Sequence, residues 1–212
     1  MTEQFIAVQE KDKVVIKKPK SQQKAGDYAL KPHEVKKIIY SASTFRDRCM
    51  IKTLAYTGCR RNELRNIRIE DIDWQRARLH VVAGAKFGKT RDIPLPNDLL
   101  SDLRHLIGAR NRGVLFESPR GETLTNAQIN NIIAKTAEKA GITSPDPRKR
   151  HVNPHLFRHS FARNAKASGM RLDYVQYLLG HQSYKKTADI YGTPGIEEIS
   201  QDYENKIGGM YS

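Results

Sequence analysis

The sequence predicts an α+β fold in which a mainly helical domain carries a small antiparallel three-stranded sheet. Along most of the 212-residue chain, apolar residues recur every three to four positions, as on one face of a helix. Between residues 69 and 94 the pattern changes to an alternation of apolar and polar residues, which is typical of strands. No internal repeat is visible, so we expect one globular domain with tails.

Before the sheet, a basic arm and two helices are expected. Residues 1–26 carry six lysines and little apolar periodicity, which predicts a flexible basic arm or linker. Pro32 begins the first helical pattern, because proline is favoured in the first turn of a helix. The second pattern runs from Phe45 to Gly58, where the glycine is expected to end the helix. The residues predicted to face inward are Val35, Ile38, Ile39, Met50 and Leu54.

The predicted sheet is centred on a hairpin. Leu79 and Val81 alternate with polar neighbours, and Arg91 to Pro94 has the pattern of a returning strand. Between them, residues 84–89 contain two glycines, which favours a turn between antiparallel strands.

Two helices are expected directly after the sheet. Asn97 is a suitable N-cap for the first helix, and Gly113 is expected to end it. Thr125 and Gln128 have the spacing of a capping box, which marks the start of the second helix. The apolar face of the first helix would consist of Leu99, Leu100, Leu103, Leu106 and Ile107.

Three more helices complete the pattern. Pro154 fits the first turn of one helix, and another is expected from Asp173 to Gly180. Residues 27–192 would form the main domain, and residues 193–212 a C-terminal helical tail. The tail has an apolar stripe that must pack in a groove of its own protomer or of another, formed by Ile196, Ile199, Tyr203 and Ile207.

Charge and composition limit the classes of function. The chain has 37 Lys and Arg against 23 Asp and Glu, so its net charge of +14 favours a polyanionic partner. Residues 148–172 hold seven Lys or Arg and no acidic residue, which predicts a cationic face. No signal peptide or membrane span is expected, and two cysteines without a disulfide pattern suggest a reducing compartment. We therefore expect a soluble cytoplasmic protein with reduced Cys49 and Cys59.

The chemistry of the chain is indicated first by His155 and Arg158. This H-x-x-R spacing on a helix places an imidazole and a guanidinium about one turn apart on the same face. Both could reach one phosphate, and the guanidinium could donate two parallel hydrogen bonds to its oxygens. A solvated basic helix without a ligand is the alternative for an isolated pair of this kind.

Three segments together resemble the tyrosine recombinase or phage integrase family. Residues 57–64 (TGCRRNEL) are similar to its first arginine box, T-G-x-R-x-x-E-L. Residues 153–162 (NPHLFRHSFA) are similar to the second box, and residues 178–181 (LLGH) with Tyr191 to the segment that follows it. The order and spacing of these segments agree with those of the family from Ala29 to Tyr191. The resemblance implies a DNA strand-exchange enzyme with the tyrosine recombinase catalytic fold.

The resemblance also implies a role for each matching residue. Arg60 and Arg158 correspond to the two arginines that hold the phosphate, and His155 to the histidine that assists proton transfer at the nucleophile. His181 corresponds to a third donor on the same phosphate. Tyr191 would be the nucleophile, which forms a 3′-phosphotyrosine and releases a 5′-hydroxyl without metal, ATP or another cofactor.

The family also has a lysine in a hairpin that protonates the leaving 5′ oxygen. Lys86 matches it when Arg91, Pro94 and Leu95 are aligned with the family's R-x-x-P-L, and Lys89 is the alternative. Double-stranded DNA is the implied partner, bound by a homotetramer whose free protein could be monomeric. No membrane partner is expected.

Several alternatives remain open on the sequence. Arg60 could simply pair with Glu63, His181 could stabilise a helix C-terminus, and Tyr191 could be a core tyrosine. Ten positions separate His181 from Tyr191, one more than is usual in the family, which supports a non-catalytic DNA-binding module. Tyr184 is a second nucleophile candidate, followed by Tyr203 and Tyr211.

Two further alternatives concern other functions. A type IB topoisomerase-like enzyme would share the cleavage chemistry but relax supercoils without exchanging strands. His151, His155 and His159 lie four residues apart, a spacing that suits zinc on an unbroken helix. Because Pro154 interrupts that helix, we expect no metal there and a supporting hydrogen bond from His159 instead.

Overall fold

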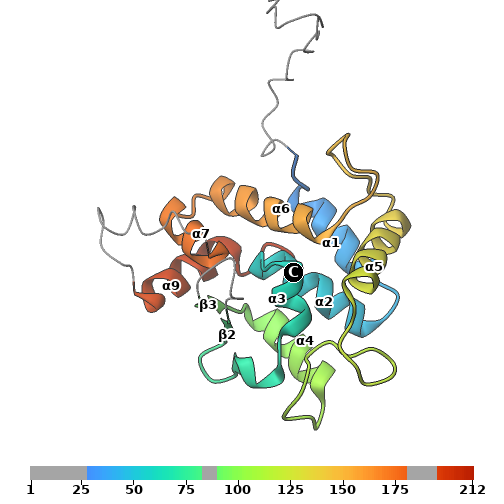
Figure 1. Ribbon diagram of the computed structural model, residues 1–212. Helices are drawn as coiled ribbons and strands as arrows, with labels where there is room; N and C mark the ends of the chain where they lie inside the picture. The colour runs from blue at the N-terminus through green and yellow to red at the C-terminus, as the bar shows by residue number, and fades with distance from the viewer. Residues whose placement is uncertain (1–27, 83–89, 181–194) are drawn as a thin grey trace, which may run out of the picture.

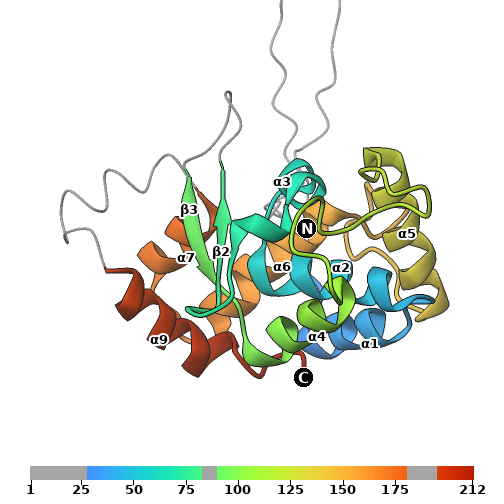
Figure 2. The same ribbon diagram turned by 90° about the horizontal axis from the view of Figure 1, so that it is seen from below.

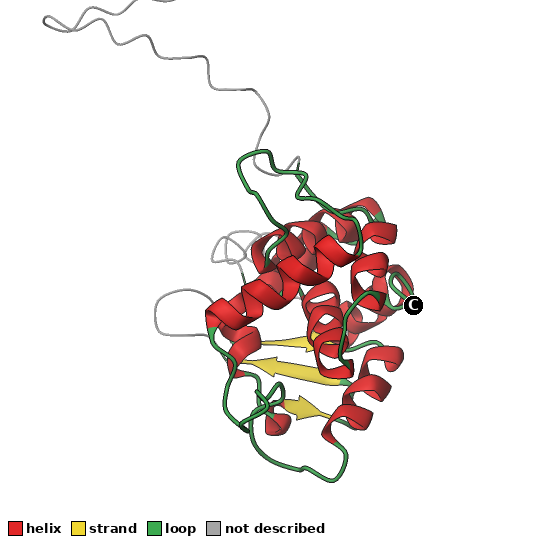
Figure 3. Cartoon of the chain, turned by 90° about the vertical axis from the view of Figure 1, so that its right-hand side faces the viewer, coloured by secondary structure: helices red, strands yellow, loops and turns green. Residues whose placement is uncertain are grey.

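The computed structural model describes residues 28–82, 90–180 and 195–212. The elements, in chain order, are α1 (Pro32–Tyr40), α2 (Phe45–Thr57), α3 (Arg61–Asn66), the 3-10 helix η2 (Ile69–Asp71), β1 (Ile72–Asp73), β2 (Arg78–Val81), β3 (Arg91–Pro94), α4 (Asn97–Ile107), α5 (Asn126–Lys139), α6 (Pro154–Ala167), α7 (Leu172–Leu179) and α9 (Ile196–Ile207). The α+β prediction is confirmed: helices dominate, and one small sheet lies at the side of the molecule (Figure 3).

The sheet is antiparallel and has the order β1-β2-β3. Leu79 pairs with Ile72 on one side and with Ile93 on the other, and all three side chains are buried. The alternation that predicted β2 and β3 is therefore confirmed. Figure 2 shows the sheet beside α7 and α9 at one side of the molecule, with α5 at the opposite side.

The helical core is centred on α2, which packs against α1, α4 and α6 (Figure 1). Met50, Ile51 and Leu54 of α2 are fully buried. Thr44 begins the helix by accepting a hydrogen bond from the Asp47 N–H, and Gly58 ends it in the left-handed conformation, as expected. Because α2 is enclosed on several sides, its C-terminal end is a rigid support for residues 58–60.

Some helix boundaries differ from the predictions. The helix α4 ends at Ile107 rather than at Gly113, because Gly108 takes a backbone conformation with φ 55° and ψ −121° that suits glycine. Asn97 is the first residue of this helix, and Pro96 occupies its N-cap position. The capping box of Thr125 and Gln128 is present as predicted, with two reciprocal hydrogen bonds.

The C-terminal helix α9 packs on the same chain. Ile199, Tyr203 and Ile207 are buried, and α9 contacts β3. The Tyr203 hydroxyl donates a hydrogen bond of 2.7 Å to the backbone oxygen of Tyr56 in α2. The predicted apolar stripe therefore has a groove within its own protomer. In the described part of the chain, no helix has the length and apolar character needed to cross a membrane.

Candidate active site

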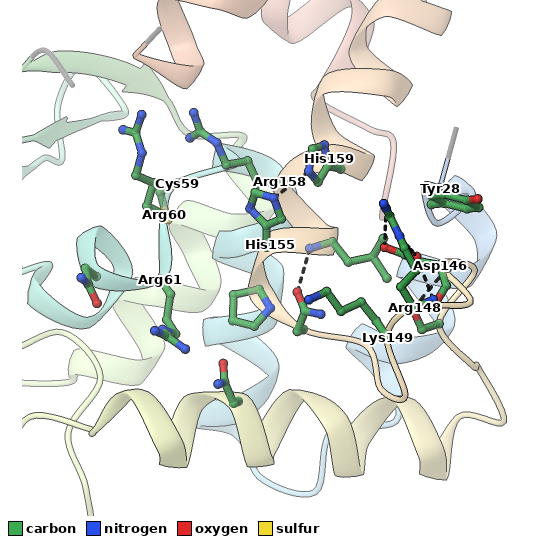
Figure 4. A pocket seen from close by; sticks show the side chains of 16 residues that line it. Tyr28, Cys59, Arg60, Arg61, Asp146, Arg148, Lys149, His155, Arg158 and His159 are labelled. Carbon is green, nitrogen blue, oxygen red and sulfur yellow. Dashed lines mark hydrogen bonds and ion pairs between the residues drawn. The ribbon is translucent and has the colours of Figure 1, made fainter. Parts of the chain in front are cut away.

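Figure 4 shows a wide, open cavity of about 1090 Å³. It is lined by the N-terminal ends of α3 and α6, by α5, and by the loop before α6. Its walls are strongly cationic: Asp146 is the one acidic residue among the described lining residues, and the Lys and Arg residues are Arg60, Arg61, Arg148, Lys149 and Arg158. Such a surface attracts an anionic ligand, and its openness suits a polymer backbone better than an enclosed small molecule.

Glu63 has a side chain that is only 7% exposed, and it holds two arginines. Its carboxylate accepts hydrogen bonds from the Arg60 Nη1 at 2.9 Å and from both terminal nitrogens of Arg91, at 3.2 and 3.0 Å. It also accepts from the Arg60 backbone N–H at 2.7 Å, which caps the start of α3. Burial alone would raise the pKa of Glu63, but the bonds and charges of Arg91 and Arg60 lower it below its usual value.

The C-terminal end of α7 binds three arginines through three consecutive carbonyl groups. The oxygens of Leu178, Leu179 and Gly180 accept, in that order, from Arg91 at 2.5 Å, Arg158 at 2.6 Å and Arg60 at 3.5 Å. Helix C-termini carry partial negative charge and unpaired carbonyl groups, so they stabilise nearby cations. This helix end therefore holds the guanidinium groups of Arg91 and Arg158, and that of Arg60 lies at its edge.

Arg158 is held from a second direction as well. Its Nη1 donates a 2.9 Å hydrogen bond to the Gly58 oxygen at the end of α2. Two of its five N–H donors are thus bound to helix ends. Burial, followed by the charges of Arg60 and Arg91, lowers the pKa of Arg158 to about 10, so the group is still charged at neutral pH.

Two glycines allow this close packing. Gly58 has φ 57°, and a Cβ there would lie 2.6 Å from the Phe161 ring of α6. Gly180 has φ 63°, and a Cβ there would lie 2.9 Å from the Arg91 Nη1. Both positions require glycine for backbone conformation and for space, which gives a physical reason for the glycines in TG-x-R and LLGH.

His155 lies beside Arg158 on α6, as the H-x-x-R spacing predicted. Figure 4 shows the side chains of Arg60 and Arg158 pointing in the same direction, whereas Arg61 points the other way. The His155 Nε2 is 2.7 Å from the Nε2 of His159. Burial and the neighbouring positive charges lower the pKa of His155, which favours the neutral imidazole at neutral pH.

The chain is similar to known proteins over most of its length. The sequence profile of the phage integrase family matches residues 29–194, most of the chain. The chain belongs to the phage integrase family. The tyrosine recombinase XerA of Pyrococcus furiosus is 34% identical over 194 residues, which cover 85% of this chain and 64% of XerA. The tyrosine recombinase XerC of Oceanobacillus iheyensis is 33% identical over 150 residues, covering 67% of this chain and 47% of XerC.

Solved structures of the phage integrase family have the same fold. The crystal structure of XerA recombinase matches with a TM-score of 0.64 and 28% identity, covering 88% of this chain and 64% of that one. The integrase from mycobacterium phage Brujita matches with a TM-score of 0.70 and 22% identity, covering 92% and 61%. The chain thus spans about half to two thirds of the length of these relatives.

Of the six site residues predicted for this family member, three are described. Arg60, His155 and Arg158 line the same cavity, although 98 positions (60 to 158) separate the two arginines in the sequence. Lys86, His181 and Tyr191 lie outside the described residues, so their roles stay predictions. The segments that contain them follow β2 and Gly180, and Gly180 lies beside Arg60 and Arg91.

Arg91 also belongs to the site, although it was not among the site residues predicted from the sequence. A signal for Arg91 was available: it occupies an inward position of β3, where an arginine is buried only with a partner. The ion pair expected between Arg60 and Glu63 is present, but the same carboxylate also binds Arg91. Arg60 can therefore pair with Glu63 and still bind a phosphate.

Two weaker nucleophile candidates lie away from the cavity. Tyr203 is fully buried, and burial raises its pKa well above the usual value. Tyr211 is also buried, with a pKa raised to about 12. Neither phenol is accessible to DNA. Tyr184, like Tyr191, lies outside the described residues.

Proposed function

We propose that this chain is a site-specific DNA recombinase or integrase that cleaves and rejoins duplex DNA through Tyr191. The observation that carries the proposal is the convergence of Arg60, Arg158 and His155 on one cationic cavity. Among the matching structures, XerH is a site-specific recombinase bound to its difH substrate in a pre-cleavage complex. Double-stranded DNA is the partner that we propose for this chain.

The proposed reaction exchanges one phosphodiester bond for another. The Tyr191 oxygen forms a bond to phosphorus, and the bond from phosphorus to the 5′ oxygen breaks. His155 accepts the phenol proton, and Lys86 supplies a proton to the leaving 5′ oxygen. Arg60, Arg158 and His181 stabilise the negative charge that develops on the phosphate. Because the phosphotyrosine keeps the energy of the broken bond, rejoining needs neither ATP nor a metal ion.

A nicked suicide duplex tests this proposal, because the short leaving strand diffuses away and traps the covalent adduct. The wild-type protein should form the adduct in EDTA, and Tyr191→Phe should form none. Tyr184→Phe is the matched control and should retain activity. An adduct that persists in Tyr191→Phe would contradict the proposal, and its absence in the wild type would favour a non-catalytic DNA-binding module.

The contribution of Arg158 can be measured in the same assay. Loss of a positioned donor costs about 3 kcal/mol, or about a hundredfold in rate. Arg158→Ala should therefore abolish detectable joining, and Arg158→Lys, which keeps the charge, should fold but cleave slowly. Plasmid relaxation and two-site recombination assays, run side by side, distinguish a topoisomerase-like enzyme from a recombinase.

The organisation of the whole protein is also part of the proposal. We infer a basic arm at 1–26, a catalytic domain at 27–192 and a C-terminal tail at 193–212 that is exchanged between protomers in a homotetramer on DNA. The free protein would be a monomer with α9 packed on its own chain. We place the protein in the cytoplasm, associated with DNA.

A further inference from the structure

His159 contacts His155 but has no part in the reaction described above. The two residues lie one turn apart on α6, with ring centroids 4.2 Å apart and ring planes at 85°. Their Nε2 atoms are 2.7 Å apart, within hydrogen-bonding distance. The start of α6 is fixed by Asn153, whose side chain accepts from the Leu156 N–H at 3.1 Å. The pair therefore stands on a capped, regular helix.

The contact restricts the number of protons on the pair. A hydrogen bond between two imidazole nitrogens needs one N–H and one free lone pair. One proton therefore lies between the two Nε2 atoms, whether the pair as a whole is neutral or carries one positive charge. Two imidazolium rings would place two N–H groups against each other and break the contact.

The surroundings favour the positive charge on His159. Burial lowers the pKa of both imidazoles, and Arg158 lowers both further. Lys149 also disfavours a charge on His155, whereas Asp146 favours a charge on His159. The charged side chains that face this cavity from α3, α6 and the loop before α6 are Arg60, Arg61, Asp146, Arg148, Lys149 and Arg158.

We propose that His159 is a positioning residue that orients the His155 imidazole and takes over the positive charge when His155 accepts a proton. The inference rests on the proposed function, in which His155 takes part in proton transfer. The incoming proton binds the Nδ1 of His155, because its Nε2 is engaged with His159. The shared proton then moves from the Nε2 of His155 to the Nε2 of His159. His155 is neutral again, and the charge lies on His159, where Asp146 favours it.

Side-chain ¹⁵N NMR of the free protein tests the shared proton without any need for activity. As the pH is lowered from 8.5, the pair should take up its two protons in two well-separated steps, the first mainly on His159. In His159→Gln, His155 should titrate in a single step, and His33→Gln, at an exposed position of α1, should change nothing. Independent titration of the two rings, unchanged by either substitution, would overturn the proposal.

Cleavage kinetics test the consequence for the reaction. At neutral pH, His159→Gln should slow adduct formation about tenfold, below the 10²- to 10⁴-fold typical of a general acid or base. His159→Phe, which cannot form the hydrogen bond, should be slower still, and DNA affinity should change less than about twofold in both. The pH at which the cleavage rate falls on the acid side should change in His159→Gln. In His33→Gln it should be the same as in the wild type.

The double variant His155→Gln/His159→Gln decides whether His159 acts through His155. If it does, the double variant should cleave no more slowly than His155→Gln alone, because residues that act as a unit are not additive. Full activity in His159→Phe, or multiplied effects in the double variant, would overturn the proposal. If the wild type forms no adduct, the proposed function fails, and the NMR titration still decides whether the proton is shared.

Discussion

Glu63 shows how one carboxylate makes a cationic site compatible with folding. Arg91 has a side chain that is 1% exposed, and Glu63 is 7% exposed, so both charges depend on each other. Arg60 shares the same carboxylate and remains 32% exposed at the edge of the cavity. The buried pair thus provides a fixed base, and the outer guanidinium remains accessible to a ligand.

Glu63→Gln should destabilise the protein by about 3–5 kcal/mol at pH 7, because it leaves the Arg91 charge buried without its partner. The folded protein lowers the Glu63 pKa, so its stabilising effect is complete above the ordinary value of 4.5 and is lost as the pH falls through the lowered value. Urea unfolding at several pH values should therefore show a smaller difference from the wild type at low pH.

The exposed Glu70 provides the control for this experiment. Its pKa is also lowered, chiefly by a backbone hydrogen bond, but it lies at the surface. Glu70→Gln should leave the free energy of unfolding close to that of the wild type, because solvent screens an exposed ion pair. A Glu63→Gln cost that is equally small, or independent of pH, would contradict the role assigned to the buried carboxylate.

Gly58→Ala should cost about 1–3 kcal/mol more than Gly141→Ala. Both glycines have positive φ, 57° and 68°, so both substitutions strain the backbone. A Cβ at Gly58 would also overlap the Phe161 ring, whereas the nearest atom at Gly141 is the Lys37 Nζ at 3.8 Å. Thermal unfolding measures the difference, and equal losses would show that Phe161 can move away without cost.

At the scale of elements, the features that were predicted correctly depend on residues close together in the sequence. Features that depend on long-range contacts were not predicted. Thr125 and Gln128 marked the start of α5 correctly, because a capping box depends on residues three positions apart. The three-stranded sheet was predicted, but the positions of β1 and of the short helix α3 were not, since two and six residues are too few for a periodic pattern. The end of α4 was predicted at Gly113 instead of Gly108 because glycine alone does not reveal its φ.

The same distinction applies to the site. The motifs around residues 57–64 and 153–162 identified Arg60, His155 and Arg158. The bonds from these arginines to the end of α7 could not be predicted from spacing, because the accepting carbonyl groups lie 120 and 21 positions from Arg60 and Arg158 in the sequence. Backbone carbonyl groups also carry no signal in the residue type.

The packing of α9 gives a prediction for a whole element. Ile199 is fully buried, so Ile199→Ala should cost about 2–5 kcal/mol in the free energy of unfolding. Ile196, on the same helix but only half-buried, is the matched control and should cost less. Chemical denaturation at two protein concentrations checks this result. A loss for Ile199→Ala that depends on concentration would indicate that α9 packs on another protomer instead.

At the scale of the whole molecule, the chain has a net charge of +14, and five of its Lys and Arg residues line the cavity where the proposed ligand binds. Release of counterions from DNA makes such binding strongly dependent on salt. The exposed Lys149 lines the cavity, and its charge acts on His155. Lys149 thus contributes both to the attraction of DNA and to the pKa of His155.

Lys149→Ala should weaken DNA binding and reduce the slope of log K against log salt by about 1, because one phosphate contact is lost. Lys206, exposed on α9 and absent from the residues that line the cavity, is the control, and its substitution by Ala should leave the slope unchanged. Fluorescence anisotropy between 50 and about 200 mM salt measures both. Equal slopes for the two variants would place the DNA elsewhere.

The three carbonyl groups at the end of α7 have a consequence for heat tolerance. Arg91 and Arg158 each bond to this helix end as well as to Glu63 or Gly58, so undocking of α7 would remove one of the two supports of each guanidinium group. Heating should therefore abolish DNA cleavage and melt the fold in one cooperative transition. Selection for DNA cleavage at high temperature would then act directly on how the C-terminal end of α7 packs against these arginines.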